Sequence, residues 1–79
     1  MKSKTLDELR VDLASNLKSI RKARGLAQER LALDAGVDRT VVSKIERGVT
    51  NPSLEILLRL ANQLDVQVGK LLLPPPSPK

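Results

Sequence analysis

Cysteine, histidine and all three large aromatic residues are absent from this chain of 79 residues. Without cysteine there is no disulfide and no thiolate metal site. Without histidine the chain lacks the commonest metal ligand and the usual general base near neutral pH. The carboxylates, among them Glu29, Asp34 and Glu55, form no paired catalytic motif. We therefore expect a protein that is not an enzyme and that holds no metal and no cofactor.

The missing aromatic rings also argue against binding of single-stranded nucleic acid, which depends on stacking of the bases. Long apolar runs are missing as well, since no stretch approaches the roughly 20 residues of a membrane span. The first ten residues, "MKSKTLDELR", are charged throughout and have no apolar segment of the kind found in signal peptides. These absences predict no membrane partner and a cytoplasmic location.

The size of the chain predicts one small domain with an aliphatic core, for which association with a second copy is a common source of stability. A domain this short leaves no evident place for a small-molecule ligand.

The net charge is +5, and residues 1–24 carry seven basic and three acidic groups, whereas residues 25–50 carry four of each. A basic protein suits a polyanionic partner.

Five helical segments and no convincing strand are indicated, so the fold class is all-α. Residues 6–24 follow a Thr5–Glu8 capping box and carry an apolar stripe from Leu6 to Ile20 at helical spacing. Further helices are predicted at about 28–35, 39–47 and 54–64, with a last turn or two at 68–73. The domain would span residues 1–73, and the proline-rich residues 74–79 would form a flexible tail.

The segment 39–47 has two different faces when it is placed on a helical wheel. Its hydrogen-bonding side chains fall within about 140° of arc, and its aliphatic side chains lie opposite them. Such a helix fits the major groove of DNA, where base edges offer partners to arginine, lysine, serine and threonine. The alternative is an ordinary solvated face of a surface helix.

The surrounding motifs carry a more specific resemblance. The pattern G-L-x-Q-x-x-L-A at residues 25–32, A-G-V at 35–37, S-x-I-E-R-G at 43–48 and N-P-S-L at 51–54 stand in order within residues 17–66. In this order the chain resembles the Cro/phage-repressor (XRE) helix-turn-helix family, and it is also similar to the controller proteins of restriction–modification operons. The resemblance implies a lambda-repressor-like domain of five helices, with the helix-turn-helix motif at about 28–47.

The resemblance also implies a role for each residue that matches a functional position of the family. The residues that would read base edges are Arg39, Thr40, Ser43 and Lys44. Arg39 is the leading candidate, because a guanidinium can donate two hydrogen bonds to guanine; the alternative is an ion pair with Asp38 or Asp34. Lys44 is equally placed for a phosphate.

Phosphate contacts are implied for Gln28, Arg47 and Asn51. Gln28 would begin the first helix of the motif, where free backbone amides attract phosphate, or would only cap its own helix. The residue before it, Ala27, departs from the family's usual serine, threonine or asparagine. For Arg47 and Asn51 the alternative is simple solvation of a loop.

Two further groups of residues have implied structural roles. Arg21 and Glu46 would form a partly buried salt bridge between the first and third helices, since a lone buried charge would be costly. The apolar end of the chain would form a two-fold dimer contact through Val68, Leu71, Leu72 and Leu73. Its alternative is core packing against the first and fourth helices.

Together these expectations describe a homodimeric, sequence-specific regulator of transcription that binds a palindromic operator in double-stranded DNA through helix 39–47. The alternative function is an antitoxin or adaptor module whose main role is to hold a protein partner.

Overall fold

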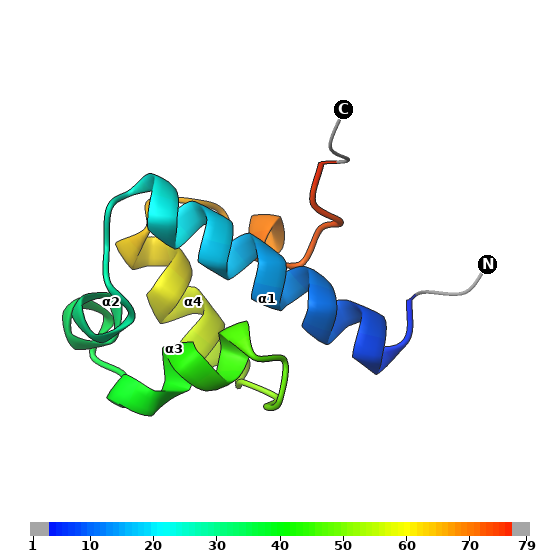
Figure 1. The fold of residues 1–79 in the computed structure, drawn as a ribbon, viewed down its shortest axis with the longest axis horizontal. Helices are drawn as coiled ribbons and strands as arrows, with labels where there is room; N and C mark the ends of the chain where they lie inside the picture. The colour runs from blue at the N-terminus through cyan, green and yellow to red at the C-terminus, as the bar shows by residue number, and fades with distance from the viewer. Residues whose placement is uncertain (1–3, 77–79) are drawn as a thin grey trace.

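The computed structural model describes residues 4–76 and shows four α-helices followed by a short 3-10 helix (Figure 1). The elements are α1 (Leu6–Ala23), α2 (Gln28–Ala35), α3 (Arg39–Glu46), α4 (Leu54–Gln63) and η1 (Val68–Leu71). No strand occurs within residues 4–76. The all-α class is therefore confirmed, and the boundaries of the four α-helices lie within about one residue of those predicted.

The fifth predicted helix is the element that differs most from expectation. It is a single 3-10 turn of four residues, Val68–Leu71, rather than an α-helix that runs to residue 73. Gly69 lies inside this turn, and glycine disfavours a helix by about 1 kcal/mol relative to alanine. Pro74 then follows within three residues, and its ring prevents the helix from continuing. Of the predicted tail, residues 77–79 lie outside the described residues, as do residues 1–3.

Most helix starts have a side-chain cap that satisfies free backbone amides. Both halves of the Thr5–Glu8 capping box are present at α1. Asp38 caps α3 and Ser53 caps α4, each accepting a hydrogen bond from a backbone amide in the first turn. Among the α-helices the start of α2 is the exception, because Ala27 has no side-chain acceptor to offer. The first backbone amides of α2 therefore find no side-chain acceptor at position 27.

The turn between α2 and α3 depends on the backbone conformation of Gly36. This residue has a φ of +71° and lies in the left-handed region, where the helix-ending hydrogen bond from the Val37 amide to the Ala32 carbonyl closes the turn. A Cβ atom at Gly36 would lie 3.2 Å from the guanidinium of Arg59. Position 36 therefore favours glycine for its left-handed conformation, while the flexible Arg59 side chain could move away from a Cβ atom.

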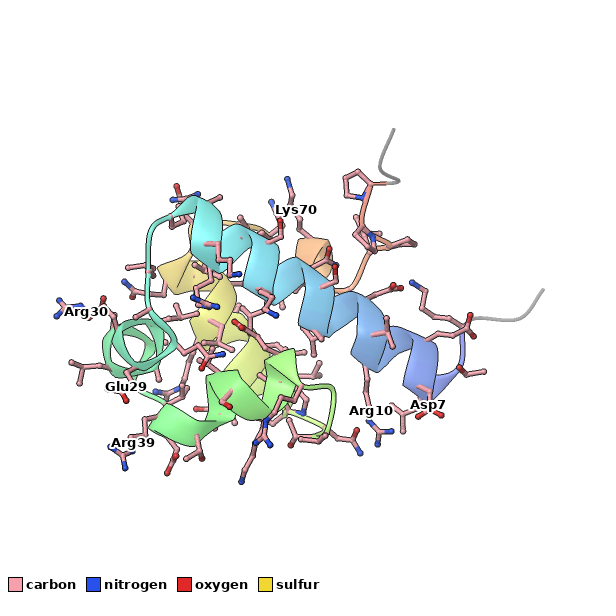
Figure 2. All side chains as sticks on the ribbon, viewed as in Figure 1. Asp7, Arg10, Glu29, Arg30, Arg39 and Lys70 are labelled. Atoms are coloured by element: carbon pink, nitrogen blue, oxygen red, sulfur yellow. The ribbon has the colours of Figure 1, made fainter. Side chains whose placement is uncertain are left out.

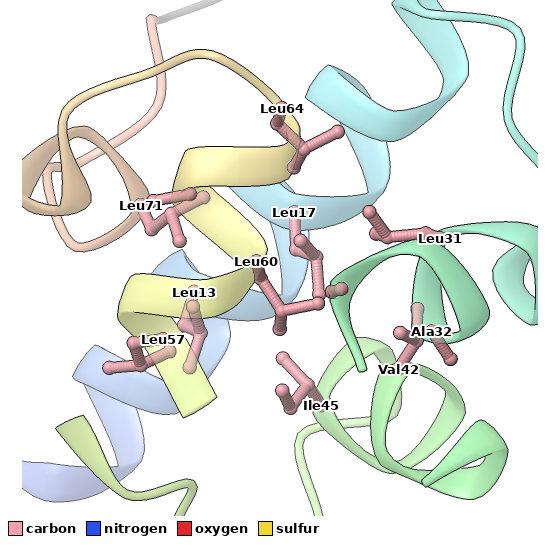
Figure 3. Packing of buried hydrophobic residues seen from close by; sticks show 12 residues of the cluster. Leu13, Leu17, Leu31, Ala32, Val42, Ile45, Leu57, Leu60, Leu64 and Leu71 are labelled. Carbon is pink, nitrogen blue, oxygen red and sulfur yellow. The ribbon is translucent and has the colours of Figure 1, made fainter. Parts of the chain in front are cut away.

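All five elements contribute side chains to one aliphatic core (Figure 3). Its fully buried members include Leu17 of α1, Leu31 of α2, Ile45 of α3 and Leu60 of α4. Close packing of aliphatic groups replaces the absent aromatic rings, and each buried leucine contributes about 1.5–3 kcal/mol through removal from water. The back of α3 is thereby anchored to the domain.

The first turn of α1 does not join this core. Leu6 was predicted to belong to the buried stripe, yet it is 54% exposed. Figure 1 shows the reason, since the N-terminal part of α1 extends beyond the other helices. The buried part of the stripe begins at Leu13.

The C-terminal segment is attached to α1 by a buried amide. Asn16 is 8% exposed, and its Nδ2 donates to the carbonyl oxygens of Leu71 at 2.9 Å and Leu73 at 2.6 Å. The Leu71 side chain is completely buried in the core. This burial supports the alternative of core packing for Leu71, because a side chain enclosed by its own domain offers little surface to a second copy.

Within residues 4–76, no helix has both the length and the apolar character needed to cross a membrane. The same part of the chain contains no cluster of three or more acidic side chains arranged to hold a metal ion.

Candidate nucleic-acid interface

The two faces of α3 are separated as the helical pattern predicts. Val42 and Ile45 are buried, at 0% and 1% exposure, and fix the helix to the body. Arg39, Thr40 and Lys44 are exposed, and Ser43 is half-buried between them. The result is a row of hydrogen-bonding side chains on one side of a helix whose opposite side is held by the core.

Arg39 lies at the start of α3 and extends away from the body (Figure 2). The ion pairs that could have engaged it do not form: Asp34 pairs with Arg30 at 3.1 Å, and Asp38 bonds Thr40. Among residues 4–76 the guanidinium of Arg39 has no hydrogen-bond partner. It therefore keeps all its donors for an external acceptor.

Asp38 shapes the first turn of this helix. Its Oδ1 accepts from the Thr40 hydroxyl at 2.7 Å and from the Thr40 backbone amide at 2.8 Å. These two bonds, the hydroxyl bond first, lower the pKa of Asp38 below its usual value. The Thr40 hydroxyl donates its proton within the chain, so it faces a ligand as an acceptor.

Behind this surface lies the predicted salt bridge between α1 and α3. Arg21 donates to Glu46 twice, at 2.6 Å from Nε and at 2.9 Å from a terminal nitrogen, and a third donor reaches the Leu26 carbonyl at 2.7 Å. The two side chains are only 9% and 2% exposed. The bidentate geometry satisfies both charges, which a buried pair requires.

Gln28 joins the same network, which the sequence did not indicate. Its Nε2 donates to Glu46 Oε1 at 2.9 Å, so its side chain links the start of α2 to the end of α3. Burial alone would raise the pKa of Glu46, but the hydrogen bonds from Arg21 and Gln28 outweigh it and hold the pKa below its usual value. The carboxylate remains ionised at neutral pH.

The observed bond also revises the two interpretations of Gln28. Its side chain does not cap its own helix, because its hydrogen bond goes to Glu46. A carboxylate only accepts, so the amide nitrogen must face Glu46, and one N–H of that nitrogen stays available. The side chain can therefore serve both the buried network and a phosphate.

The loop after α3 brings the two remaining predicted phosphate residues to the surface. Arg47 is exposed and makes only a long contact of 3.4 Å from Nε to the Ser43 carbonyl. Asn51 is also exposed, and its Oδ1 accepts from Nε of Arg10 at 2.8 Å. Arg10 belongs to α1 and was not among the predicted site residues. The sequence separation of 41 residues concealed this contact.

The candidate dimer residues divide into two groups. Leu71 belongs to the core, and Val68 and Leu72 pack partly against it. Leu73 is 61% exposed, which makes it the main accessible apolar side chain of this segment. The predicted alternative of core packing thus holds for Leu71, whereas a dimer contact through Leu73 stays a prediction.

A match to a family model shows to which family the domain belongs. The helix-turn-helix model HTH_3 matches residues 17–71, which is most of the chain and includes α2, the Gly36 turn and α3. The chain belongs to the helix-turn-helix family. The XRE-type resemblance is confirmed by this match.

Individual relatives agree with this assignment. A hypothetical transcription factor of Neisseria meningitidis is 43% identical over 68 residues, which cover 86% of this chain and 64% of that protein. The chain thus spans somewhat less than two thirds of this relative's length. The crystal structure of a hypothetical transcription factor NHTF from Neisseria is 39% identical, with a TM-score of 0.83 over 95% of this chain and 86% of that chain.

The similarity extends to a restriction–modification controller. The crystal structure of the controller protein C.AhdI from Aeromonas hydrophila is 42% identical, with a TM-score of 0.75 over 78% of this chain and 94% of that chain. The relatives of this helix-turn-helix domain are thus named as regulators of transcription or as controller proteins.

Proposed function

We propose that this protein is a sequence-specific regulator of transcription that binds double-stranded DNA with α3 in the major groove. The observation that carries the proposal is the geometry of α3, with Val42 and Ile45 completely or almost completely buried while Arg39 and Lys44 extend into solvent. A helix fixed on one side and exposed on the other can enter the groove without rearrangement of the domain.

Base edges and phosphates would be contacted by different side chains. Arg39, at the first position of α3, would donate to guanine, while Thr40, Ser43 and Lys44 would contact neighbouring base edges. Phosphates would be held by Gln28, Arg47 and Asn51, which lie at the two ends of the helix-turn-helix unit. Phosphate contacts give affinity and register, and base contacts give specificity.

The protein would act as a homodimer on a palindromic operator. Two domains related by a two-fold axis present two copies of α3 about one helical turn of DNA apart, roughly 34 Å. Leu73, with the half-buried Val68 and Leu72, supplies an apolar surface near the C-terminal end for such a contact. Occupation of promoter DNA would then change transcription without any catalytic step.

The similarity to C.AhdI supports a controller role in a restriction–modification operon as the more specific form of this proposal. In this role the protein would act on bacterial DNA, which lies in the cytoplasm. A methyltransferase or endonuclease gene beside its own gene would support the controller role, and a toxin gene there would favour the antitoxin alternative.

Selection from a pool of random-sequence duplexes tests the proposal directly. The protein should enrich an inverted repeat whose half-sites are about 10–11 base pairs apart, or a multiple of that spacing. Sedimentation of the complex should give two chains per duplex. Enrichment of no sequence above the starting pool would contradict sequence-specific regulation, and enrichment of a single half-site would contradict the dimer.

A further inference from the structure

The positive charge that would attract DNA is unevenly distributed along the chain. Residues 25–50, which contain the helix-turn-helix unit, carry four basic and four acidic groups, so their net charge is zero. Residues 1–24 carry seven basic and three acidic groups. Four of these seven basic groups, Arg10, Lys18, Arg21 and Lys22, lie in α1. Because neutralisation of phosphates supplies most nonspecific affinity for DNA, the cations of α1 are candidates for contacts outside the helix-turn-helix unit.

Besides the buried Arg21, which pairs with Glu46, Arg10 is an α1 cation that contacts the recognition side. Its Nε donates to Oδ1 of Asn51, in the loop that leaves α3, at 2.8 Å. Figure 2 shows Arg10 and Arg39 pointing toward the same edge of the molecule, whereas Lys70 points toward the opposite edge. Arg10 also lies outside residues 17–71, the part that matches the family model.

The contact between Arg10 and Asn51 leaves both side chains with N–H groups that can donate to an anion. A guanidinium only donates, so the atom that it faces must be the carbonyl oxygen of Asn51. The Asn51 amide nitrogen therefore points away from Arg10 and has no partner among residues 4–76. Arg10 uses one donor on Asn51 and one on Asp7, which leaves three of its five N–H groups. Donors from α1 and from the α3–α4 loop thus lie together.

We propose that Arg10 contacts a DNA phosphate beside Asn51 and so extends the DNA-binding surface onto the first helix. This proposal rests on the proposed function, since it assumes that α3 faces the duplex. Arg10 would add to affinity on every sequence, because a phosphate contact carries no base information.

Asp7 would compete with the phosphate for Arg10. Its carboxylate accepts from a terminal nitrogen of Arg10 at 2.9 Å, but its side chain is 90% exposed. An exposed pair three residues apart on a helix contributes little stability, so a phosphate can replace it at small cost. The removal of the Asp7 charge should therefore strengthen binding to DNA.

The test is the salt dependence of binding, measured on the duplex selected from the random pool and on a scrambled duplex of the same length. For Arg10→Gln, the slope of log K against log salt should become shallower by about 0.9 for each half-site, because one phosphate contact is lost. At 0.1 M salt this corresponds to about eightfold weaker binding per half-site on both duplexes. The ratio of the affinities for the selected and the scrambled duplex should stay unchanged. Asp7→Asn should bind more tightly.

Two further variants separate a phosphate contact from a structural role of Arg10. Arg10→Lys keeps the charge but loses the geometry of the Asn51 bond, and it should retain the slope of the natural protein. Lys70→Gln removes an equal charge at the opposite edge and should leave the slope unchanged. If Arg10→Gln keeps the natural slope, or if Arg10→Lys behaves like Arg10→Gln, the proposal is overturned.

The same data distinguish this inference from the proposed function. A natural protein that prefers the selected duplex while Arg10→Gln keeps its slope would refute only the role of Arg10. A natural protein that binds both duplexes equally would refute the proposed function. In that case the slope on the scrambled duplex would still decide whether Arg10 contacts phosphate.

Discussion

Gln28 donates a hydrogen bond of 2.9 Å to Glu46, a carboxylate that is already paired with Arg21. This contact joins the start of α2, where a phosphate would lie, to the end of the recognition helix. Three elements therefore meet at one buried carboxylate: α1 through Arg21, α2 through Gln28 and α3 through Glu46 itself. The orientation of α3 depends on that meeting point as well as on the aliphatic core.

Replacement of Glu46 by glutamine should destabilise the domain by about 3 kcal/mol at neutral pH, because it leaves the Arg21 charge buried without its counter-charge. The pKa of Glu46 in the folded state lies below its ordinary value of 4.5. Its contribution to stability is therefore complete above that value and is lost as the pH falls through the folded-state pKa. Urea unfolding measured between about pH 7 and pH 3 tests both statements.

The difference in unfolding free energy between the natural protein and Glu46→Gln should shrink toward pH 3. Glu55→Gln provides a matched control, because Glu55 forms an exposed pair with Arg59 on α4 and such pairs contribute about 0–1 kcal/mol. A constant difference between the natural protein and Glu46→Gln across the pH range would show that the ionised pair is not the source of stability.

The uncapped start of α2 offers a stabilising change. Ala27 has the extended backbone of a helix cap, with φ −73° and ψ 156°, but no side-chain acceptor. Ala27→Ser should therefore stabilise the domain by about 1 kcal/mol. For a domain of this size the midpoint of thermal unfolding should rise by about 4–8 °C. Circular dichroism can follow the transition, with Ala27→Val as a control that cannot cap; an equal midpoint for both variants would contradict the explanation.

The dimer proposal depends on Leu73, whose side chain is 61% exposed. Leu73→Asp should weaken self-association by at least about tenfold, since a buried carboxylate without a partner costs several kcal/mol. Its helix content should stay the same, because Leu73 lies outside the core. Leu33→Asp, at a 72% exposed position of α2, is the control that should remain dimeric. Sedimentation velocity that shows Leu73→Asp as an unchanged dimer would place the interface elsewhere.

Local signals account for the parts of the fold that could be predicted from the sequence. The capping box at Thr5, the caps at Asp38 and Ser53 and the glycine at position 36 define helix ends within a few residues of chain. The two faces of α3 follow from helical periodicity alone. The Arg21–Glu46 pair came from the family resemblance and not from spacing.

The contacts that the sequence did not indicate join distant residues. Gln28 and Glu46 are 18 residues apart, and Arg10 and Asn51 are 41 apart. Periodicity cannot show which of several leucines a small core will enclose. Leu6 was expected in the buried stripe and is exposed, while Leu71, for which a dimer contact and core packing were both open, is buried. The end of α4 also differs from the first three helices, because Asp65 adopts the left-handed conformation that glycine supplies elsewhere.

The central claim is that Arg39 reads a base while the domain holds α3 in place. The decisive measurement is the ratio of affinities for the selected duplex and the scrambled duplex, determined for the natural protein, for Arg39→Ala and for Lys70→Ala. One bidentate contact to guanine contributes about 1–3 kcal/mol of discrimination. The account predicts that Arg39→Ala reduces the ratio by about tenfold or more per half-site and still binds the scrambled duplex, while Lys70→Ala keeps the natural ratio. An unchanged ratio for Arg39→Ala would contradict it.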